Sequence, residues 1–356
     1  MNAQYPITTT PKYNFPLPEE NLQLPLDFIE VSMRSLKHMK PVKLTQENPT
    51  SFHQIPKKQT TLNPTTVLAK LKADPTKIPI VAMDVSSIRL GETEKGILIA
   101  LRGAIVWKQD TQYRYLRLGP FPFHITNKTQ LEISSLFRKH RQTIRIQKHT
   151  IPNIFYLQTR LTTLLERWIQ SSVNHTTRRS LILWDGSLTA GTPETPTRDM
   201  AQLLEEARIR KNTILAFSKM TRLLFNGRRL TNLLSDHEPP CIMRIEDNTL
   251  YEGPMHLMGN IYVAKLTRGS LAFRMDVDKQ VPHLHVVESV QKLLGNDVVL
   301  QSYPETLRLA HIFSTFTAIE VLGIQRCLFK EKNLKILAKP NVRRILFGPF
   351  GKGLEG

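Results

Sequence analysis

Two aspartates in the sequence each follow an apolar stretch and precede small hydroxyl residues. The first stretch is Ile78–Met83, apolar apart from Pro79, and it leads into Asp84-Val85-Ser86-Ser87. The second is Leu181–Trp184, which leads into Asp185-Gly186-Ser187. Apolar runs of this kind are typical of buried strands, and open α/β sheets place their chemistry at the carboxyl ends of strands. Because carboxylate oxygens bind hard divalent cations, the pair predicts a metal site suited to phosphoryl-transfer chemistry.

A structural role for each aspartate is the alternative, since aspartate before glycine or serine is common in turns and at helix caps. The charge of the chain bears on this choice. Its 356 residues include 49 Lys and Arg against 30 Asp and Glu, for a formal net charge of +19. Such an excess indicates a polyanionic partner, with nucleic acid the leading candidate and a membrane surface the weaker one. A basic protein with two strand-end aspartates favours the metal site.

Cysteine content and hydropathy limit the class of protein. Cys241 and Cys327 are the only cysteines and form no CxxC pattern, so neither a disulfide framework nor a structural zinc site is expected. The N-terminal residues do not resemble a signal peptide, and no apolar run is long enough to span a membrane. We therefore expect a soluble cytoplasmic protein with no membrane partner. The chain also lacks a GxxxxGK[ST] phosphate loop, which argues against ATP hydrolysis.

The order of the predicted elements indicates an α/β fold with a mixed sheet. The elements are strands at 78–84, 96–107 and 112–118, helices at 130–141 and 153–170, the strand beginning at 181, a helix at 198–210 and a strand at 213–217. The first three strands have short turns between them, which predicts an antiparallel meander. The later strand-helix-strand order requires parallel strands joined by a right-handed crossover.

The remaining sequence predicts additions to this sheet. Expected there are a helix at 219–234, a hairpin of 260–266 and 270–277, a helix at 284–294, a short strand at 298–301 and a long helix at 304–329. Residues 1–75 predict an irregular N-terminal arm with short helices near 26–37 and 65–73. Residues 76–329 form the predicted domain, and 330–356 a basic C-terminal tail.

A meander followed by parallel strands resembles the ribonuclease H-like fold, whose nucleases carry one aspartate on the first strand and another on the fourth. The C-terminal third adds a more specific resemblance. Tyr303-Pro304, Leu307 and Ala310-His311 are similar to the Tyr-Pro, Leu, Ala-His signature of the NurA nuclease family, with the same spacing from tyrosine to histidine. The fold implied is therefore a ribonuclease H-like mixed sheet flanked by helices, with N- and C-terminal extensions.

Other motifs agree with the NurA family in their order along the chain. They are Glu166 before the Asp-Gly-Ser-Leu motif, Ser218-Lys219 after the next strand, and Phe273-Arg274-Met275-Asp276. The resemblance spans about 78–329. One departure is Val85, which stands where the family usually has glycine. Since valine lacks the freedom of glycine at positive φ, we expect a different turn after Asp84.

The resemblance implies which residues form the site. Asp84, Glu166, Asp185 and His311 would be the metal ligands, and Tyr303 would join them as a catalytic residue. A nitrogen donor among oxygens favours manganese, with magnesium as the alternative. Glu132 is a second candidate for the place of Glu166, whose position on its helix also fits a solvated residue.

Basic residues are the candidates for substrate binding. Lys219 and Arg274 lie in the family-like motifs, and Lys219 could equally cap a strand. Arg138 and Arg141 belong to the most concentrated basic cluster in the chain. Contacts of this type would hold DNA through its phosphates without reading sequence, and solvated surface is the alternative role for such clusters.

The sequence thus predicts a metal-dependent DNA nuclease. By resemblance it would be a 5′ to 3′ exonuclease, and also a single-strand endonuclease, acting on single- and double-stranded DNA in end resection and double-strand break repair. The family further implies a homodimer and a HerA-type hexameric ATPase as partner. Two alternatives stay open: a catalytically inactive DNA-binding adaptor of the translocase, and a nuclease directed at RNA.

Overall fold

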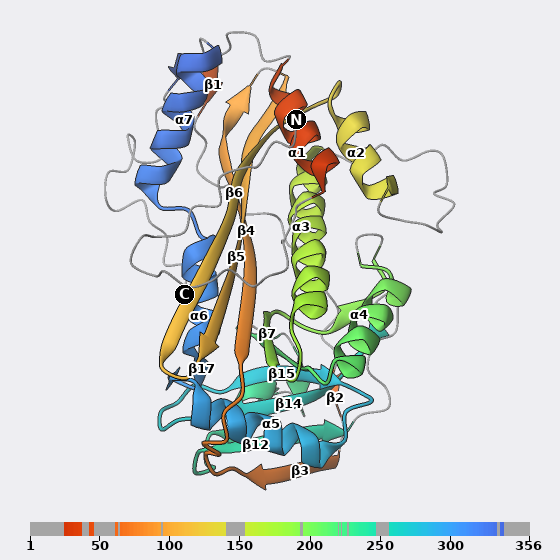
Figure 1. Ribbon diagram of the computed structural model, residues 1–356, viewed down its shortest axis with the longest axis vertical. Coiled ribbons are helices and arrows are strands. Elements are labelled where there is room, and N and C mark those ends of the chain that lie inside the picture. Colours follow the sequence, from red (N-terminus) through yellow and green to blue (C-terminus); the bar gives the residue numbers. More distant parts are fainter. Residues whose placement is uncertain are drawn as a thin grey trace.

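The computed structural model describes residues 25–37, 43–45, 61–62, 65–93, 95–139, 154–192, 195–219, 221, 223–225, 228–246, 256–332 and 335–337. Its centre is a long antiparallel meander of three strands (Figure 1). These are β4 (Ile80–Thr93), β5 (Gly96–Gln109) and β6 (Gln112–Thr126). β5 lies between the other two and pairs antiparallel with both. The meander was predicted, but each strand is longer than the sequence indicated.

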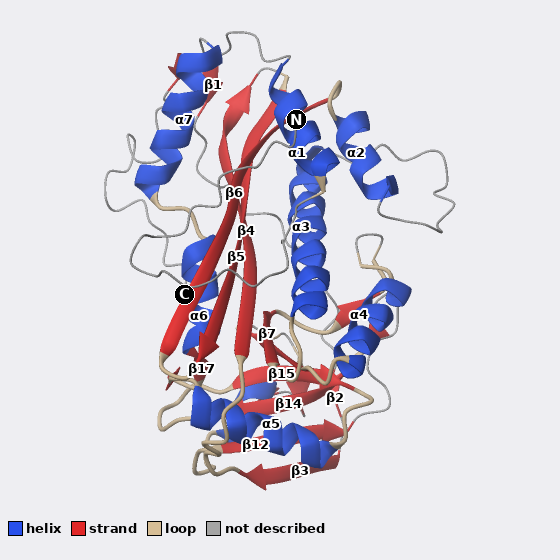
Figure 2. Ribbon diagram, in the orientation of Figure 1, coloured by secondary structure: helices blue, strands red, loops and turns tan. Residues whose placement is uncertain are grey.

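Parallel strands join the meander along β4. β7 (Leu181–Asp185) pairs parallel with β4, and β9 (Thr213–Ser218) pairs parallel with β7. The helix α4 (Thr197–Ile209) lies between β7 and β9 in the chain. The strand order β6-β5-β4-β7-β9 is the ribonuclease H-like arrangement that the sequence predicted, and Figure 2 shows the mixed sheet flanked by helices.

The sheet continues beyond β9 with four antiparallel strands. In spatial order they are β15 (Phe273–Asp278), β14 (Gly259–Lys265), β12 (Cys241–Glu246) and β3 (Thr65–Lys70). The predicted hairpin is β14 with β15, and it is confirmed. The predicted helix near 65–73 was wrong. Three consecutive β-branched residues, Thr65 to Val67, favour a strand, and every residue of β3 finds a partner on β12.

Helices cover both faces of the sheet. On one face lie α3 (Ile154–Thr176) and α4, with α1 (Leu26–Lys37) and α2 (Gln130–Lys139) at the upper end in Figure 1. On the other lie α5 (His283–Asn296) and α6 (Glu305–Ser314). The bounds of α1 match the predicted helix, because its apolar residues recur at helical spacing and pack on β6.

Alternating side chains of the central strands separate the two faces. Val81 and Met83 of β4 pack in the core beneath α3, whereas Ile80 and Ala82 pack in the core beneath α6. β7 divides in the same way, with Trp184 toward α3 and Leu183 toward α6. Side chains alternate along a strand, so the residue after Met83 and the residue after Trp184 both lie on the α6 face.

Two helical predictions in the C-terminal half were wrong. The stretch 219–234 holds the short strands β10 (Leu224–Phe225) and β11 (Arg228–Arg229) and the 3-10 helix η1 (Leu230–Leu234). The long helix at 304–329 is two helices, α6 and α7 (Ala318–Lys332), because the backbone is extended at Thr315. Short strands complete the described chain: β1 (Lys43–Thr45), β2 (Thr61–Leu62), β8 (Thr189–Ala190), β13 (His256–Leu257), β16 (Val299–Leu300), β17 (Tyr303–Pro304) and β18 (Lys335–Leu337).

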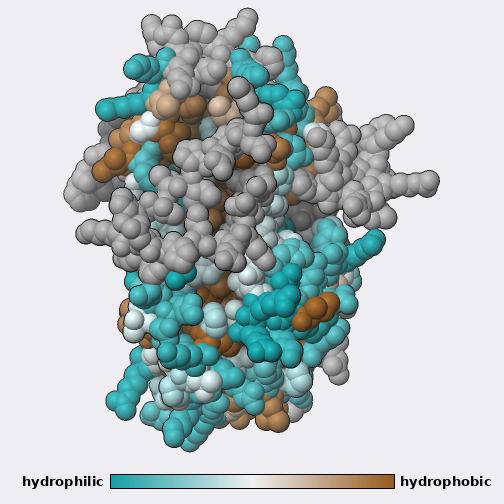
Figure 3. Space-filling model, in the orientation of Figure 1, coloured by the Kyte–Doolittle hydropathy of each residue, from teal (hydrophilic) through white to brown (hydrophobic). Residues whose placement is uncertain are grey.

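Among the described residues, Glu305–Leu328 has the length and composition of a membrane-spanning segment. Its structure is that of two packed helices, since it is broken at Thr315. Glu320, at the start of α7, is also tied to the sheet by Arg102 at 3.0 Å and Arg117 at 2.5 Å. The apolar residues that α7 exposes, such as Ile319, lie on the upper part of the molecule, whereas the lower part of the face in Figure 3 is mainly hydrophilic.

Candidate metal centre

Asp84, Asp185 and His311 come together on the α6 face of the sheet. One ligand atom from each can be chosen so that all three lie within 4.8 Å of one another. His311 Nδ1 is 2.8 Å from Asp84 Oδ2 and 3.8 Å from Asp185 Oδ2. The two aspartates are partly buried and the histidine is exposed. These three side chains meet because Asp84 and Asp185 both point to the face of the sheet on which α6 packs.

Asp84 lies inside β4 and not at its end, which corrects the sequence-based expectation. β4 pairs with β7 only from Ile80 to Met83, whereas its pairing with β5 continues to Thr93. Val85 sits within the strand, opposite Gly103, so no turn follows Asp84. A β-branched residue suits this extended backbone. The carboxylate is nevertheless accessible, because the pairing of β4 with β7 stops one residue before it.

The helix α6 holds His311 against the aspartates. Leu307 and Ala310 bury one side of the helix in the core. At its N-terminus, the buried Asp297 accepts a hydrogen bond from the Thr306 N–H at 3.0 Å through Oδ2. Asp297 thereby satisfies one of the backbone donors that a helix start leaves free and complements the helix dipole.

Two serines complete the surroundings of Asp84: Ser86, which belongs to the motif found in the sequence, and Ser314, which the sequence analysis did not identify. The buried Ser314 donates a hydrogen bond to Asp84 Oδ2 at 2.7 Å, and its Oγ lies 2.9 Å from Ser86 Oγ. Ser314 is three residues after His311, so both face the sheet from α6. Ser86 is two residues after Asp84 and shares its face of β4. Its spacing from His311 is the signal by which Ser314 could have been found.

The loop after Asp185 is fixed by hydrogen bonds to neighbouring strands. The Gly186 N–H donates to the Phe217 carbonyl at 2.7 Å, and Ser218 Oγ donates to the Gly186 carbonyl at 2.8 Å. Gly186 has φ +132°, a conformation that residues with a Cβ rarely adopt. The Asp-Gly-Ser motif therefore sets the direction of the Asp185 side chain.

Arg274 lies in the scaffold of this loop. Its guanidinium donates two hydrogen bonds of 2.7 Å to Asp276, one to each carboxylate oxygen. Asp276 Oδ2 in turn accepts the Leu188 N–H at 3.0 Å. Both charged side chains are buried, with Arg274 only 5% exposed. This pairing gives Arg274 a structural role and offers no surface for the substrate contact that the sequence predicted.

Lys219 pairs with Asp185, with its Nζ 2.5 Å from Oδ2. It also lies over the ring of Tyr303, 5.7 Å from the ring centre. Burial raises the pKa of Asp185, and the hydrogen bond and charge of Lys219 oppose that rise. Lys219 therefore carries a positive charge directly at the site, where a phosphate could meet it.

Glu166 lies on α3, which covers the opposite face of the sheet. Burial is the main cause of its raised pKa, the adjacent Arg167 opposes the rise, and the charges of Asp84 and Asp185 add to it. Gln170 donates a hydrogen bond to Glu166 Oε1 at 3.0 Å. The other candidate, Glu132, pairs with Arg34 of α1 at 2.9 Å. Of the two glutamates, Glu166 is the one whose pKa responds to the charges of Asp84 and Asp185.

Tyr303 is buried beside the same carboxylates. Its pKa is raised by burial and by the charges of Asp185 and Asp84. The hydroxyl is buried and has no hydrogen-bond partner among the residues that the structure describes. The other two predicted substrate contacts are not placed by the structure: Arg141 lies outside the described residues, as does the side chain of Arg138.

The donor set fits a divalent cation. Asp84 and Asp185 offer carboxylate oxygens, and His311 offers an imidazole nitrogen. Asp84, Asp185 and Glu166 place three carboxyl groups in one region, where burial raises the pKa of Glu166 and the charges of the two aspartates add to that rise. A bound cation would relieve this repulsion, and mixed oxygen and nitrogen ligands suit manganese or another transition metal as well as magnesium.

No protein-family model matches the sequence, and no curated protein matches it. Among solved structures, an endonuclease V from Bacillus subtilis aligns over 88% of this chain and 97% of its own, with 9% identity and a TM-score of 0.36. A NurA structure aligns over 73% and 90%, with 10% identity and a TM-score of 0.33. An A. aeolicus Argonaute aligns over 69% and 29%, with 12% identity and a TM-score of 0.21. Scores this low do not assign an activity.

Proposed function

We propose that this chain is a metal-dependent DNA nuclease of the NurA type. The observation that carries the proposal is the meeting of Asp84, Asp185 and His311, whose ligand atoms lie within 4.8 Å. These residues are remote in sequence, from separate motifs, and the fold gathers them at one point. The net charge of +19 supports DNA as the substrate, because phosphate binding requires many cations.

In this proposal Asp84, Asp185 and His311 hold the metal, with Glu166 as a further carboxylate ligand. A metal bound there would supply an activated water and would stabilise charge on the phosphodiester oxygens. Ser314 holds the Asp84 carboxylate in place through its hydrogen bond at 2.7 Å. The Asp276 carboxylate fixes the loop that carries Asp185. Lys219 Nζ lies 2.5 Å from Asp185 Oδ2. When substrate binds, Lys219 leaves this carboxylate and pairs with a substrate phosphate.

The finer parts of the function follow the family resemblance and the motifs that carry it. They are 5′ to 3′ exonuclease activity with single-strand endonuclease activity, a role in end resection and double-strand break repair, and manganese as the metal in preference to magnesium. A homodimer and a HerA-type hexameric ATPase are the proposed partners. Tyr303 is proposed to act beside the metal, and Arg138 and Arg141 to contact DNA phosphates.

The proposal is tested by cleavage of end-labelled single- and double-stranded DNA with manganese, magnesium or EDTA. Asp185→Asn should reduce cleavage at least about 10³-fold while DNA binding is kept, because the amide keeps the shape but loses the charge that holds metal. The matched control is Asp110→Asn, at an exposed turn, which should cleave as the wild type does. Wild-type cleavage by Asp185→Asn would overturn the site. Binding without cleavage under every metal would instead favour the adaptor.

A further inference from the structure

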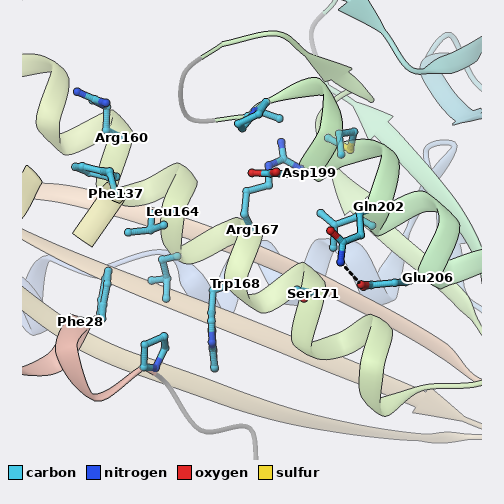
Figure 4. Close-up of a pocket in the computed structure, with 16 residues that line it drawn as sticks. Phe28, Phe137, Arg160, Leu164, Arg167, Trp168, Ser171, Asp199, Gln202 and Glu206 are labelled. Carbon is cyan, nitrogen blue, oxygen red and sulfur yellow. Dashed lines mark hydrogen bonds between the residues drawn. The ribbon is translucent and has the colours of Figure 1, made fainter. Parts of the chain in front are cut away.

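A cavity of about 270 Å³ lies beside α3 and is lined by residues of α3 and α4 (Figure 4). Pro25 next to α1, Phe28 of α1 and Phe137 of α2 also line the cavity. Its volume is near the lower end of the range for small-molecule sites, roughly 300–1,000 Å³. It is therefore large enough for one small group and too small for a folded chain or a duplex.

The lining combines a flat apolar surface with charges of both signs. Trp168, Leu164 and Phe28 give it an apolar part. Arg160 and Arg167 contribute positive charge, and Asp199 and Glu206 contribute negative charge. Figure 4 shows these side chains around one space, with Arg160 beside Phe137. The Arg160 guanidinium lies 4.8 Å from the centre of the Phe137 ring.

Arg167 Nε, a donor, and Glu206 Oε2, an acceptor, are buried without a hydrogen bond to any described residue. Glu206 Oε2 lies 3.5 Å from His175 Nε2. The other oxygen of Glu206 accepts a hydrogen bond from Gln202 at 3.0 Å. Buried polar atoms of this kind are costly unless a partner satisfies them. A ligand with both an acceptor and a donor would do so.

These properties select among ligand classes. A simple anion would meet the carboxylates of Asp199 and Glu206, and an alkyl chain would leave Arg167 and Glu206 unsatisfied. A nucleobase has apolar faces for an aromatic side chain and edges that carry both donors and acceptors. It is the ligand that matches both parts of the lining.

The helix α3 carries both lining residues of the cavity and the candidate ligand Glu166. Glu166 and Arg167 are consecutive, so their side chains leave the helix about 100° apart. Glu166 lies near Asp84 and Asp185, whereas Arg167 lines the cavity. Gln170 joins them, since it accepts a hydrogen bond from Arg167 at 2.5 Å and donates one to Glu166 at 3.0 Å.

We propose that this cavity binds a nucleobase of the DNA strand that the metal centre cleaves. This inference rests on the proposed nuclease function. A base that leaves the stack and enters the cavity would hold the strand next to the metal centre, and its contact with Arg167 would reach Glu166 through Gln170. The same chemistry could be supplied by a free mononucleotide, so the test separates the two sources.

The test measures binding in EDTA, where metal-dependent cleavage is absent. The probes are a labelled single strand, an abasic strand of the same length, and a mononucleotide such as dAMP. The variants are Trp168→Leu, which removes the aromatic face, Trp168→Phe, which keeps one, and Glu206→Gln, which removes the acceptor charge. The matched control is Glu205→Gln, an exposed neighbour on α4 that does not line the cavity.

The wild type should bind the base-containing strand more tightly than the abasic strand. Trp168→Leu should weaken binding of the base-containing strand by roughly 5- to 150-fold, the range for loss of one stacked base, and leave abasic binding unchanged. Glu206→Gln should act in the same direction, while Trp168→Phe and Glu205→Gln stay near the wild type. The proposal would be overturned if the ratio of the affinities for the base-containing and abasic strands were the same in the wild type and in Trp168→Leu.

The mononucleotide separates the sources of the base. The strand-base proposal is wrong, and a free nucleotide is the ligand, if Trp168→Leu weakens binding of dAMP but does not change binding of the strand. Failure of the nuclease function has a different result: no metal gives cleavage, yet the strand-binding ratio still depends on Trp168. Circular dichroism of each variant shows whether a loss of binding comes from unfolding.

Discussion

Two aspartates on neighbouring parts of one sheet have opposite surroundings. Asp276 on β15 is fully buried, and its oxygens are occupied by Arg274 and by the Leu188 N–H. Asp185 on β7 is partly exposed, and its partner Lys219 is an exposed, flexible side chain. The first carboxylate is satisfied by fixed groups, and the second by a group that can be exchanged. The difference separates scaffold from site where residue type alone does not.

The largest expected effect breaks the scaffold pair. Arg274→Ala leaves the Asp276 carboxylate buried without its partner, which should cost about 3–5 kcal/mol of unfolding free energy. Chemical denaturation measures this loss. Arg308→Ala is the matched control, because its pair with Glu305 is at the surface and should contribute less than about 1 kcal/mol. Equal losses in the two variants would show that the Arg274 pair is not a scaffold element.

A smaller effect is expected around Asp84, where Ser314 supports the site without binding metal. Ser314→Ala removes the hydrogen bond to Asp84 Oδ2 and should lower manganese affinity or cleavage by about 10- to 100-fold. Calorimetric manganese titration and cleavage rates measure it. Thr315→Ala is the control, since its hydroxyl bonds the His311 carbonyl but not Asp84. If both variants bound manganese like the wild type, Ser314 would have no positioning role.

The smallest effect concerns pH. The pKa of Glu166 is raised in the folded chain above its ordinary value of 4.5, mainly by burial. The folded state therefore holds a proton that the unfolded chain has lost, and stability should fall as pH rises through the window above 4.5. Glu166→Gln should remove this part of the decline. Urea denaturation in EDTA across pH 4 to 8 compares the two proteins.

Manganese should sharpen that pH comparison. At a pH where Glu166 is charged, the added cation should raise the unfolding midpoint of the wild type more than that of Glu166→Gln. The cation neutralises the carboxylate that the variant lacks. Identical pH profiles for wild type and variant would show that Glu166 ionises in the folded chain as it does in the unfolded one.

Much of the central sheet could be predicted from the sequence. Apolar runs and short turns indicated β4 to β6, and the strand-helix-strand order indicated that β7 and β9 are parallel. Asp84 and Asp185 could be placed on one sheet because buried apolar runs lead into both. The residues that support Asp84 were harder to predict from the sequence. Ser314 has an ordinary position on an apolar helix, and only the docking of α6 on β4 brings its hydroxyl to Asp84.

Three of the predictions that were wrong depend on neighbouring residues in the fold. Thr65–Lys70 became a strand because the edge of β12 was available to pair with it, which is a tertiary effect. Asp84 lies inside a strand because β5 continues past the end of β7. The role of Arg274 depends on a carboxylate two residues away on the same face of β15. For Thr65–Val67 the β-branched residues act in the same direction as the pairing with β12, whereas for Asp84 the neighbouring strands alone decide the outcome.

The pairing of Asp84 with His311 spans 227 residues, which has a consequence for synthesis. The ribosome releases the chain from its N-terminus, at roughly 5–20 residues per second. Asp84 and Asp185 therefore emerge several seconds or more before α6, which carries both His311 and Ser314. During that interval the nascent chain holds its acidic residues but lacks their nitrogen donor and their supporting hydroxyl. The order of synthesis would keep the protein inactive until its last large helices are made.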